Sequence, residues 1–189
     1  MPVDVYLLLP PVAPNMSLNL PPMVSDAPKD DPLSHQFPNS LVVPVRDFTF
    51  GAQNPTTIGS MSGGAGAGKV KFDELVVKKS VDQLSPSLFV VAASGGHFPS
   101  AQLVVRKAGG TREPAKPYLA YEFQMVFVTA VEWSGDGDDG PVEQVTFVYG
   151  GLAVGYYPQR PDGTLGKPMK QGWSEILNKQ TGPEALQGF

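Results

Sequence analysis

The chain lacks cysteine altogether and has only two histidines among its 189 residues. The absence of cysteine excludes disulfides, thiolate nucleophiles and zinc–sulfur sites, and two histidines leave little for a transition metal. An excess of basic charge is also missing: the net charge of −4 argues against a nucleic-acid partner. No long hydrophobic run occurs. The N-terminal segment MPVDVYLLLPPV combines a short apolar run with no basic region, which predicts neither a signal peptide nor a membrane span.

The sequence does have the composition of one folded domain, which we expect to span residues 1–189. Apolar residues make up 41% and charged residues 17% of the chain, as in globular proteins. Glycine and proline are frequent, with 21 and 20 residues, so turns and loops should be plentiful. Many prolines fall in residues 10–44, which we predict to be a long irregular insertion because proline removes backbone donors and fixes φ. Residues 180–189 form a short tail.

Alternating patterns predict β-strands through most of the remaining chain. We expect strands at 3–9, 45–52 and 69–81, the last with a bulge between Phe72 and Leu75 where the apolar phase changes. One short helix is expected at about 85–95, with Ser85 as N-cap, Pro86 in the first turn and Gly95–Gly96 as the stop.

The strongest pattern lies further along the chain. Apolar residues alternate from Leu119 to Trp133 and predict one unbroken strand face of unusual length. A second long run follows, with Gly150–Gly151 permitting a bend. The fold class is therefore mainly β: a rolled antiparallel barrel or two packed sheets, with one short helix and a long extended loop at 53–68.

Residues 63–69 fit G-x-x-x-x-G-K, the phosphate-binding loop of nucleotide hydrolases. That chemistry requires a buried strand before the glycines, a Ser or Thr after the lysine to hold magnesium, and a helix whose N-terminus faces the phosphates. Here Lys69 is followed by Val70 and by a β-branched segment, and TTIGSMS precedes Gly63. A flexible glycine loop that feeds a strand is the better interpretation.

Two other candidate sites also fail in their details. The acidic run 136–140 resembles the start of a calcium loop, but position 5 is Gly140 and position 12 is Phe147, so a solvated hairpin turn is preferred. His97 follows the glycine stop and is expected to be a capping or turn residue rather than a base. The sequence predicts no catalytic, cofactor-binding or metal-binding residues.

With no constellation for a reaction, long strands and a glycine loop indicate a protein that works through its surface, such as an assembly subunit. A second interpretation is a monomeric β-barrel that binds a small apolar ligand along the aromatic face at Tyr121, Phe123 and Phe127.

Several blocks of the sequence resemble the Hcp (haemolysin-coregulated protein) family, which forms the inner tube of the bacterial type VI secretion system. They are MPVDVYL, GAGKVKFDELVVKKSVD, SPSLFVVAASGGHFPSAQLVVRKAGG and YYPQRPDGTLGKPMKQGWSEILNK, which together cover residues 1–9, about 45–109 and about 118–179. The insertion at 10–44 is longer and richer in proline than this family leads us to expect, and we expect no effector domain.

The resemblance implies a hexamer that closes into a ring, rings that stack into a tube, and contacts with a contractile sheath, a spike protein and effector cargo. It also implies assembly in the bacterial cytoplasm and export without a cleaved signal peptide. A tube protein of a related contractile injection system is a further alternative. In this family the extended loop reaches a neighbouring subunit, which assigns an interface role here to Gln53, Asn54, Ile58, Met61, Gly63, Gly64, Gly66, Gly68 and Lys69.

Overall fold

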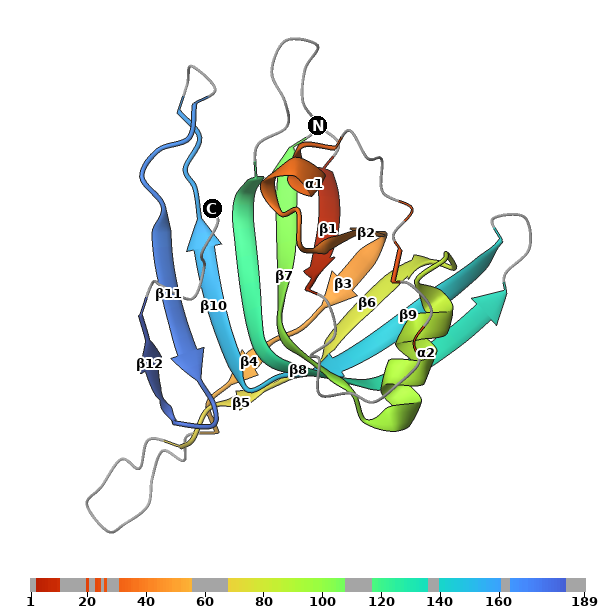
Figure 1. Cartoon of the computed structure of the whole chain (residues 1–189). Helices are drawn as coiled ribbons and strands as arrows, with labels where there is room; N and C mark the ends of the chain where they lie inside the picture. Colours follow the sequence, from red (N-terminus) through yellow and green to blue (C-terminus); the bar gives the residue numbers. More distant parts are fainter. Residues whose placement is uncertain are drawn as a thin grey trace.

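The computed structural model describes residues 3–10, 20, 23–24, 26, 31–55, 68–107, 117–135, 140–160 and 164–182. It is mainly antiparallel β-structure, as predicted, with a rolled sheet and a helix on one side (Figure 1). The helices are α1 (Pro32–Gln36) and α2 (Ser85–Ser94). The strands are β1 (Val3–Leu9), β2 (Leu41–Val45), β3 (Asp47–Thr49), β4 (Ala52–Gln53), β5 (Lys71–Phe72), β6 (Leu75–Ser80), β7 (His97–Lys107), β8 (Pro117–Gly135), β9 (Pro141–Val148), β10 (Gly151–Tyr156), β11 (Met169–Ser174) and β12 (Lys179–Thr181).

The sheet closes on itself through β8, whose second edge changes partner. One edge of β8 pairs with β7, whereas the other pairs first with β10 at residues 119–124 and then with β9 at residues 127–135. From β7 the sheet continues through β1 and β2, and from β9 through β6 and β3. Since β2 runs directly into β3, and the Arg46 amide donates to the Lys78 carbonyl at 2.8 Å, these strands complete a barrel. Strands β10, β11 and β12 extend the sheet beyond it.

The partner change falls at Met125, and it overturns the prediction of one unbroken apolar face on this strand. Met125 has φ of 54° and is exposed, while Phe123 before it and Val126 after it are both buried. The side-chain alternation therefore inverts at this residue, so that Phe127 leaves the core face and Val128 joins it. The predicted bend at Gly150–Gly151 lies opposite: the Gly150 amide donates to the Gln124 carbonyl at 2.8 Å.

Within the described part of the predicted insertion at 10–44, the expectation of an irregular segment is wrong at two places. Pro32 occupies the first turn of α1, where its missing N–H costs nothing, and the Asp31 side chain accepts from the Leu33 amide at 2.9 Å. Pro44 lies exposed in β2, an edge strand whose ladder among the described residues is formed with β1, so one absent donor is tolerated.

A buried ion pair fixes α1 on the outside of the barrel. Arg106 of β7 donates to Asp31 Oδ1 at 2.8 Å, to Asp31 Oδ2, and to the Tyr6 hydroxyl at 2.8 Å. Burial by itself raises the pKa of Asp31, but hydrogen bonds from Arg106 and the Leu33 amide outweigh it and hold that pKa below its ordinary value. Leu33 packs beside them in a small apolar cluster with Leu8, Val42 and Val104.

The start of α2 also differs from expectation, because Leu84 and not Ser85 is the N-cap. The Ser85 hydroxyl instead joins a buried network, donating to Glu143 Oε2 at 2.9 Å. Lys79 Nζ lies 2.8 Å from Glu143 Oε2 and 2.7 Å from Asp82 Oδ1, and all three charged side chains are buried. The network joins β6, β9 and the helix start. The predicted stop is confirmed, since Gly95 has φ of 69° and caps the helix.

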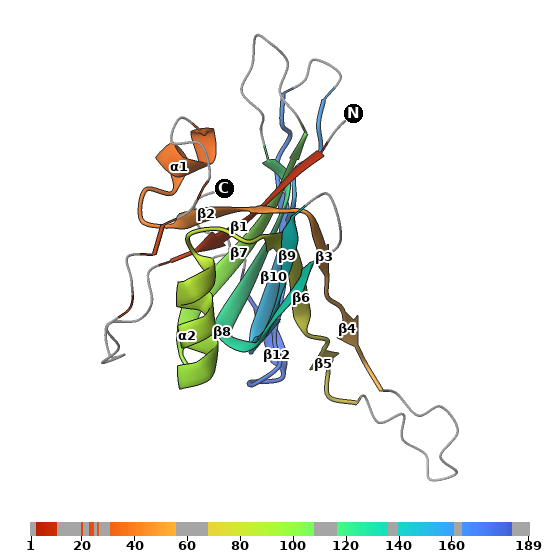
Figure 2. The same ribbon diagram turned by 90° about the vertical axis from the view of Figure 1, so that its right-hand side faces the viewer.

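The long strand predicted at 45–52 is divided among β2, β3 and β4, and the one at 69–81 between β5 and β6. The break at Asp73–Glu74 occurs where the phase change predicted a bulge. The break changes the pairing of the chain: β5 pairs with β4 in a separate two-stranded sheet, whereas β6 pairs with β3 and β9. The pair β4–β5 leaves the barrel at the end where β8 bends (Figure 2).

Candidate subunit interface

The sequence-predicted interface loop is described only at its two ends. Gln53 belongs to β4 and Asn54 follows it, while Gly68 and Lys69 precede β5, so these four residues lie together at the outer end of a β-hairpin. The five remaining predicted residues lie outside the described part of the chain: Ile58, Met61, Gly63, Gly64 and Gly66.

Gly68 shows why a glycine is needed at this position. A Cβ at Gly68 would overlap the Pro55 carbonyl oxygen and would lie 3.0 Å from Asn54 Oδ1. The two arms of the hairpin therefore approach each other closely through backbone atoms, which only glycine permits without displacement.

The base of the hairpin is anchored to the barrel by polar and aromatic contacts. Asp73 accepts from Gln53 Nε2 at 2.8 Å, and its amide donates to the Gly51 carbonyl at 2.9 Å. The Phe72 amide donates to Glu175 Oε2 at 2.9 Å, in the turn between β11 and β12. These contacts fix the position of the β4–β5 hairpin relative to the rest of the sheet.

An aromatic contact strengthens this anchor from inside the barrel. The Phe72 ring stacks on Tyr149 with centroids 5.3 Å apart. Burial, followed by the nearby carboxylates Asp73 and Glu175, raises the pKa of Tyr149, so its hydroxyl stays neutral at any physiological pH.

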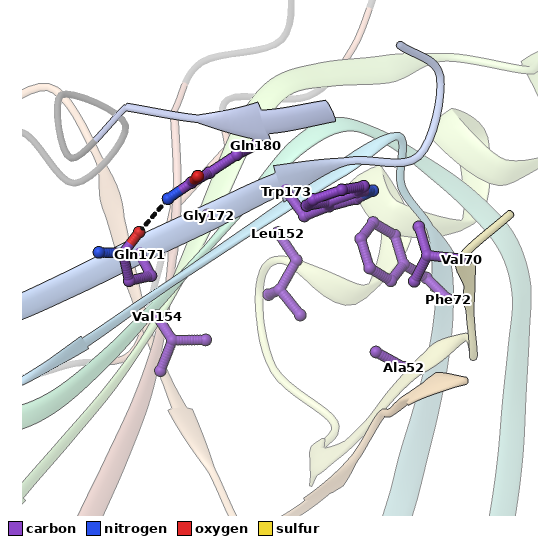
Figure 3. A pocket seen from close by; sticks show the side chains of 9 residues that line it. All are labelled: Ala52, Val70, Phe72, Leu152, Val154, Gln171, Gly172, Trp173 and Gln180. Carbon is purple, nitrogen blue, oxygen red and sulfur yellow. Dashed lines mark hydrogen bonds between the residues drawn. The ribbon is translucent and has the colours of Figure 1, made fainter. Parts of the chain in front are cut away.

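An apolar groove separates the hairpin from the extended sheet, with a volume of about 360 Å³. Figure 3 shows Phe72 and Val70 from the hairpin facing Trp173 and Leu152 from the sheet. Gln171 and Gln180 are joined by a hydrogen bond of 2.6 Å at one end. We call this the Trp173 groove; its lining is completed by Ala52, Val154 and Gly172.

The aromatic face that suggested a ligand cavity is instead packed core. Phe123 is fully buried, and the Phe50 ring contacts Tyr121 and Phe123 edge to face, with centroids 4.8 Å and 5.1 Å away. Phe127 points to the other side of β8, where His97 stacks on it at 5.0 Å. His97 is thus the first residue of β7, and the expectation of a capping or turn role is wrong.

The described residues offer no grouping of three or more His, Asp or Glu side chains suited to a metal ion. Lys69, the lysine of the nucleotide-loop motif, is exposed and leads into strand β5 rather than a helix. The acidic run at 136–139 lies outside the described residues. Among the helices that are described, neither is long and apolar enough to cross a bilayer.

What sequence reasoning missed are the two buried ion clusters and the groove. Asp82, a residue type that favours helix starts, offered a partial signal for the ion cluster at α2, where its side chain accepts from the Leu84 amide at 2.9 Å. The pairing of Lys79 with Glu143, 64 positions apart, left no local trace.

The fold is a rolled β-barrel with an anchored hairpin and an open apolar groove beside it. Comparison with known proteins agrees. The family described as "Type VI secretion system effector, Hcp" matches residues 40–156. The chain therefore belongs to the Hcp family of type VI secretion proteins.

Individual relatives fit this assignment. Protein hcp1 of Pseudomonas aeruginosa is 40% identical over 114 residues, which cover 59% of this chain and 69% of that protein. A solved structure titled "Structure of a type six secretion system protein" superposes with a TM-score of 0.74 at 27% identity, covering 95% of this chain and all of the other. The baseplate of the anti-feeding prophage, at 11% identity, a TM-score of 0.51 and coverage of 80% of this chain and 91% of the other, shares the fold alone.

Proposed function

We propose that this chain is a structural subunit of the type VI secretion inner tube that closes into hexameric rings and stacks ring on ring. Membership of the Hcp family indicates the type VI secretion system. The β4–β5 hairpin supplies a means by which one copy can contact another. Its base is held by the Phe72–Glu175 hydrogen bond and the Phe72–Tyr149 stack. A hairpin whose base is fixed can present residues 56–67 to a neighbouring subunit at a small entropic cost.

The work is mechanical in this proposal, and the chain breaks no covalent bond. Copies meet head to tail, and the rotation between them closes the ring. The lumen carries effector cargo, the outer wall meets the contractile sheath, and a spike protein caps the tube. Assembly takes place in the bacterial cytoplasm, and export follows through the apparatus itself. These partners are carried over from the family.

The test uses the loop that the hairpin presents. Deleting Gly63–Gly68 should leave a folded barrel, measured by circular dichroism and thermal unfolding, but abolish stacking or ring formation, measured by native mass spectrometry and negative-stain electron microscopy. A milder variant, Ile58→Ser combined with Met61→Ser, keeps the loop length and removes only its larger apolar side chains. Normal tubes from the deletion variant would refute the role of the loop, and a strictly monomeric parent protein at high concentration would refute the tube.

A further inference from the structure

The short helix α1 contacts the barrel through one compact surface that is separate from the main core. Leu33, its fully buried residue, packs with Leu8, Val42 and Val104 in an apolar cluster of its own. These three partners come from β1, β2 and β7 and lie on the outer face of the sheet, where α1 is seen in Figures 1 and 2. Alternate residues of the same strands belong to the main core. Helix α1 is therefore packed on the barrel and not built into it.

The barrel holds a carboxylate-binding group beside this apolar cluster. The two carboxylate oxygens of Asp31 accept from the two terminal nitrogens of Arg106, one of them at 2.8 Å. Tyr6 of β1 orients that guanidinium, because its hydroxyl accepts from Arg106 at 2.8 Å and its ring centroid lies 4.5 Å from Arg106 Cζ. Two-point recognition of a carboxylate by arginine is geometrically specific. We call this outer face the α1 site; its residues are Tyr6, Leu8, Val42, Val104 and Arg106.

Removal of α1 would break no strand ladder and would leave Arg106 with an ionic partner. Strand β1 pairs with β2 and β7 through backbone bonds in which α1 takes no part. Arg106 would keep the Tyr6 hydroxyl, and the Asp4 carboxylate lies 3.6 Å from its Nε atom. Among the described residues, that Nε atom has no hydrogen-bond partner while α1 is bound. A helix of five residues is not stable alone, so α1 orders only when it binds.

From this geometry we propose that the α1 site is a peptide-binding site, which α1 occupies as a detachable ligand of its own chain. The site recognises a segment in which a carboxylate precedes an apolar residue by two positions, as Asp31 precedes Leu33. Its occupant in trans is the 31–37 segment of a second copy. Exchange of an identical element between copies requires no new kind of contact, since it reproduces the contacts already made within one chain. The proposal does not depend on the ring or the tube.

A variant that keeps the α1 site intact but weakens its own α1 tests the proposal. Asp31→Asn combined with Leu33→Ser removes both groups that α1 inserts into the site. His35→Ser, at an exposed position of the same helix, is the matched control. The probe is a fluorescein-labelled peptide of residues 31–40, DPLSHQFPNS, and its binding is measured by fluorescence anisotropy. Circular dichroism establishes that each variant folds.

We expect the double variant to bind this peptide. The parent protein and His35→Ser should bind it at least about tenfold more weakly, because their tethered α1 competes at a high effective concentration. A peptide that itself carries the Asp31→Asn and Leu33→Ser changes should bind the double variant at least about tenfold more weakly, since it lacks the charge-assisted hydrogen bonds. Bound parent peptide should slow hydrogen exchange of β1 and β7 in the double variant.

Hydrogen exchange of the parent protein gives a second test that needs no variant. The amides of Ser34, Phe37 and Ser40 donate to carbonyls within the α1 segment at 2.9, 2.8 and 3.0 Å. Because α1 detaches as a unit while the barrel stays closed, these amides should exchange together and at least about tenfold faster than those of β7. Their exchange should depend little on dilute urea, since this opening exposes far less surface than unfolding does.

Each contrary outcome overturns a specific statement. No binding by a folded double variant, or equal binding of the two peptides, would refute the α1 site. Exchange of the α1 amides only together with those of β7, and with the same dependence on urea, would refute detachment. If the double variant fails to fold, Leu33→Ser replaces it and the same outcomes apply. Failure of Leu33→Ser to fold would also refute the proposal, because α1 would then be part of what holds the barrel together.

Discussion

The part of the sheet that closes into the barrel and the strands β10–β12 that extend beyond it differ in burial, although they share one face. We call these two parts the closed half and the open half. Along a single row of paired residues, Leu103 of β7 lies beside Tyr121 of β8, which lies beside Val154 of β10. Leu103 is fully buried, whereas Val154 is 37% exposed. The change occurs where the barrel closes through β9 and leaves β10–β12 outside. Closure, rather than residue type, decides which apolar side chains form core and which remain available for a partner.

The largest contrast should come from removing one apolar side chain in each half. Phe98→Ala, in the closed half at a fully buried position, should lower the free energy of unfolding by about 3–5 kcal/mol because it leaves a cavity. Met169→Ser, at a 65% exposed position of the open half, should change it by less than about 0.5 kcal/mol. Urea unfolding of both variants measures the difference. Similar losses in both would show that the open half is covered in the isolated chain.

A buried charge in the closed half should cost nearly as much. Lys79→Met leaves Glu143 and Asp82 buried without the ammonium group that neutralises them, and it should destabilise the chain by about 3 kcal/mol. Lys78→Met is the matched control, since Lys78 is half exposed and pairs with Asp47 at 3.5 Å, where such pairs contribute under about 1 kcal/mol. Equal unfolding midpoints for the two variants would contradict a structural role for the network.

These two predictions indicate how far the sequence alone could lead. The strand periodicity, the helix with its Gly95 stop, the break near Asp73 and the bend at Gly150 were all predictable because they depend on local backbone chemistry. The inversion at Met125 was not, because the residue adopts φ of 54° only where β8 exchanges β10 for β9. The same limit applies to α1, whose place on the barrel depends on Asp31 reaching Arg106, 75 positions away.

The candidate interface likewise has one part that the sequence predicted and one part that it did not. The sequence predicted a glycine loop at 53–68 that leads into a strand, and residues 68–70 do lead into β5. The groove was not predictable, because Val70 and Trp173 come together only after the hairpin is anchored through Glu175. Contacts between distant segments have no signature in single-sequence periodicity.

The Asp31–Arg106 pair makes stability depend on pH on the acidic side. Because the folded-state pKa of Asp31 is lowered, its contribution is fully present above the ordinary carboxyl pKa and is lost as pH falls through the folded value. The difference in unfolding free energy between the parent protein and Asp31→Asn should therefore be constant from pH 7 to pH 5 and shrink toward pH 3. Urea unfolding at these three pH values measures it. A difference that grows on acidification would contradict the ion pair.

Glu122 should give the smallest effect and the opposite sign. This carboxyl lies on the outer side of β8, beside the open half, and burial raises its pKa, although hydrogen bonds from Gln102 at 3.2 Å and Gln124 at 3.4 Å offset part of the rise. A raised folded-state pKa means that stability is full below the ordinary carboxyl pKa and is lost as pH rises through the folded value. Glu122→Gln should therefore stabilise the chain slightly at pH 7 and have no effect near pH 3, and urea unfolding at both pH values measures the difference. A loss of stability at pH 7 in Glu122→Gln would mean that the ionised carboxylate is compensated, and the contrast with Asp31 would then disappear.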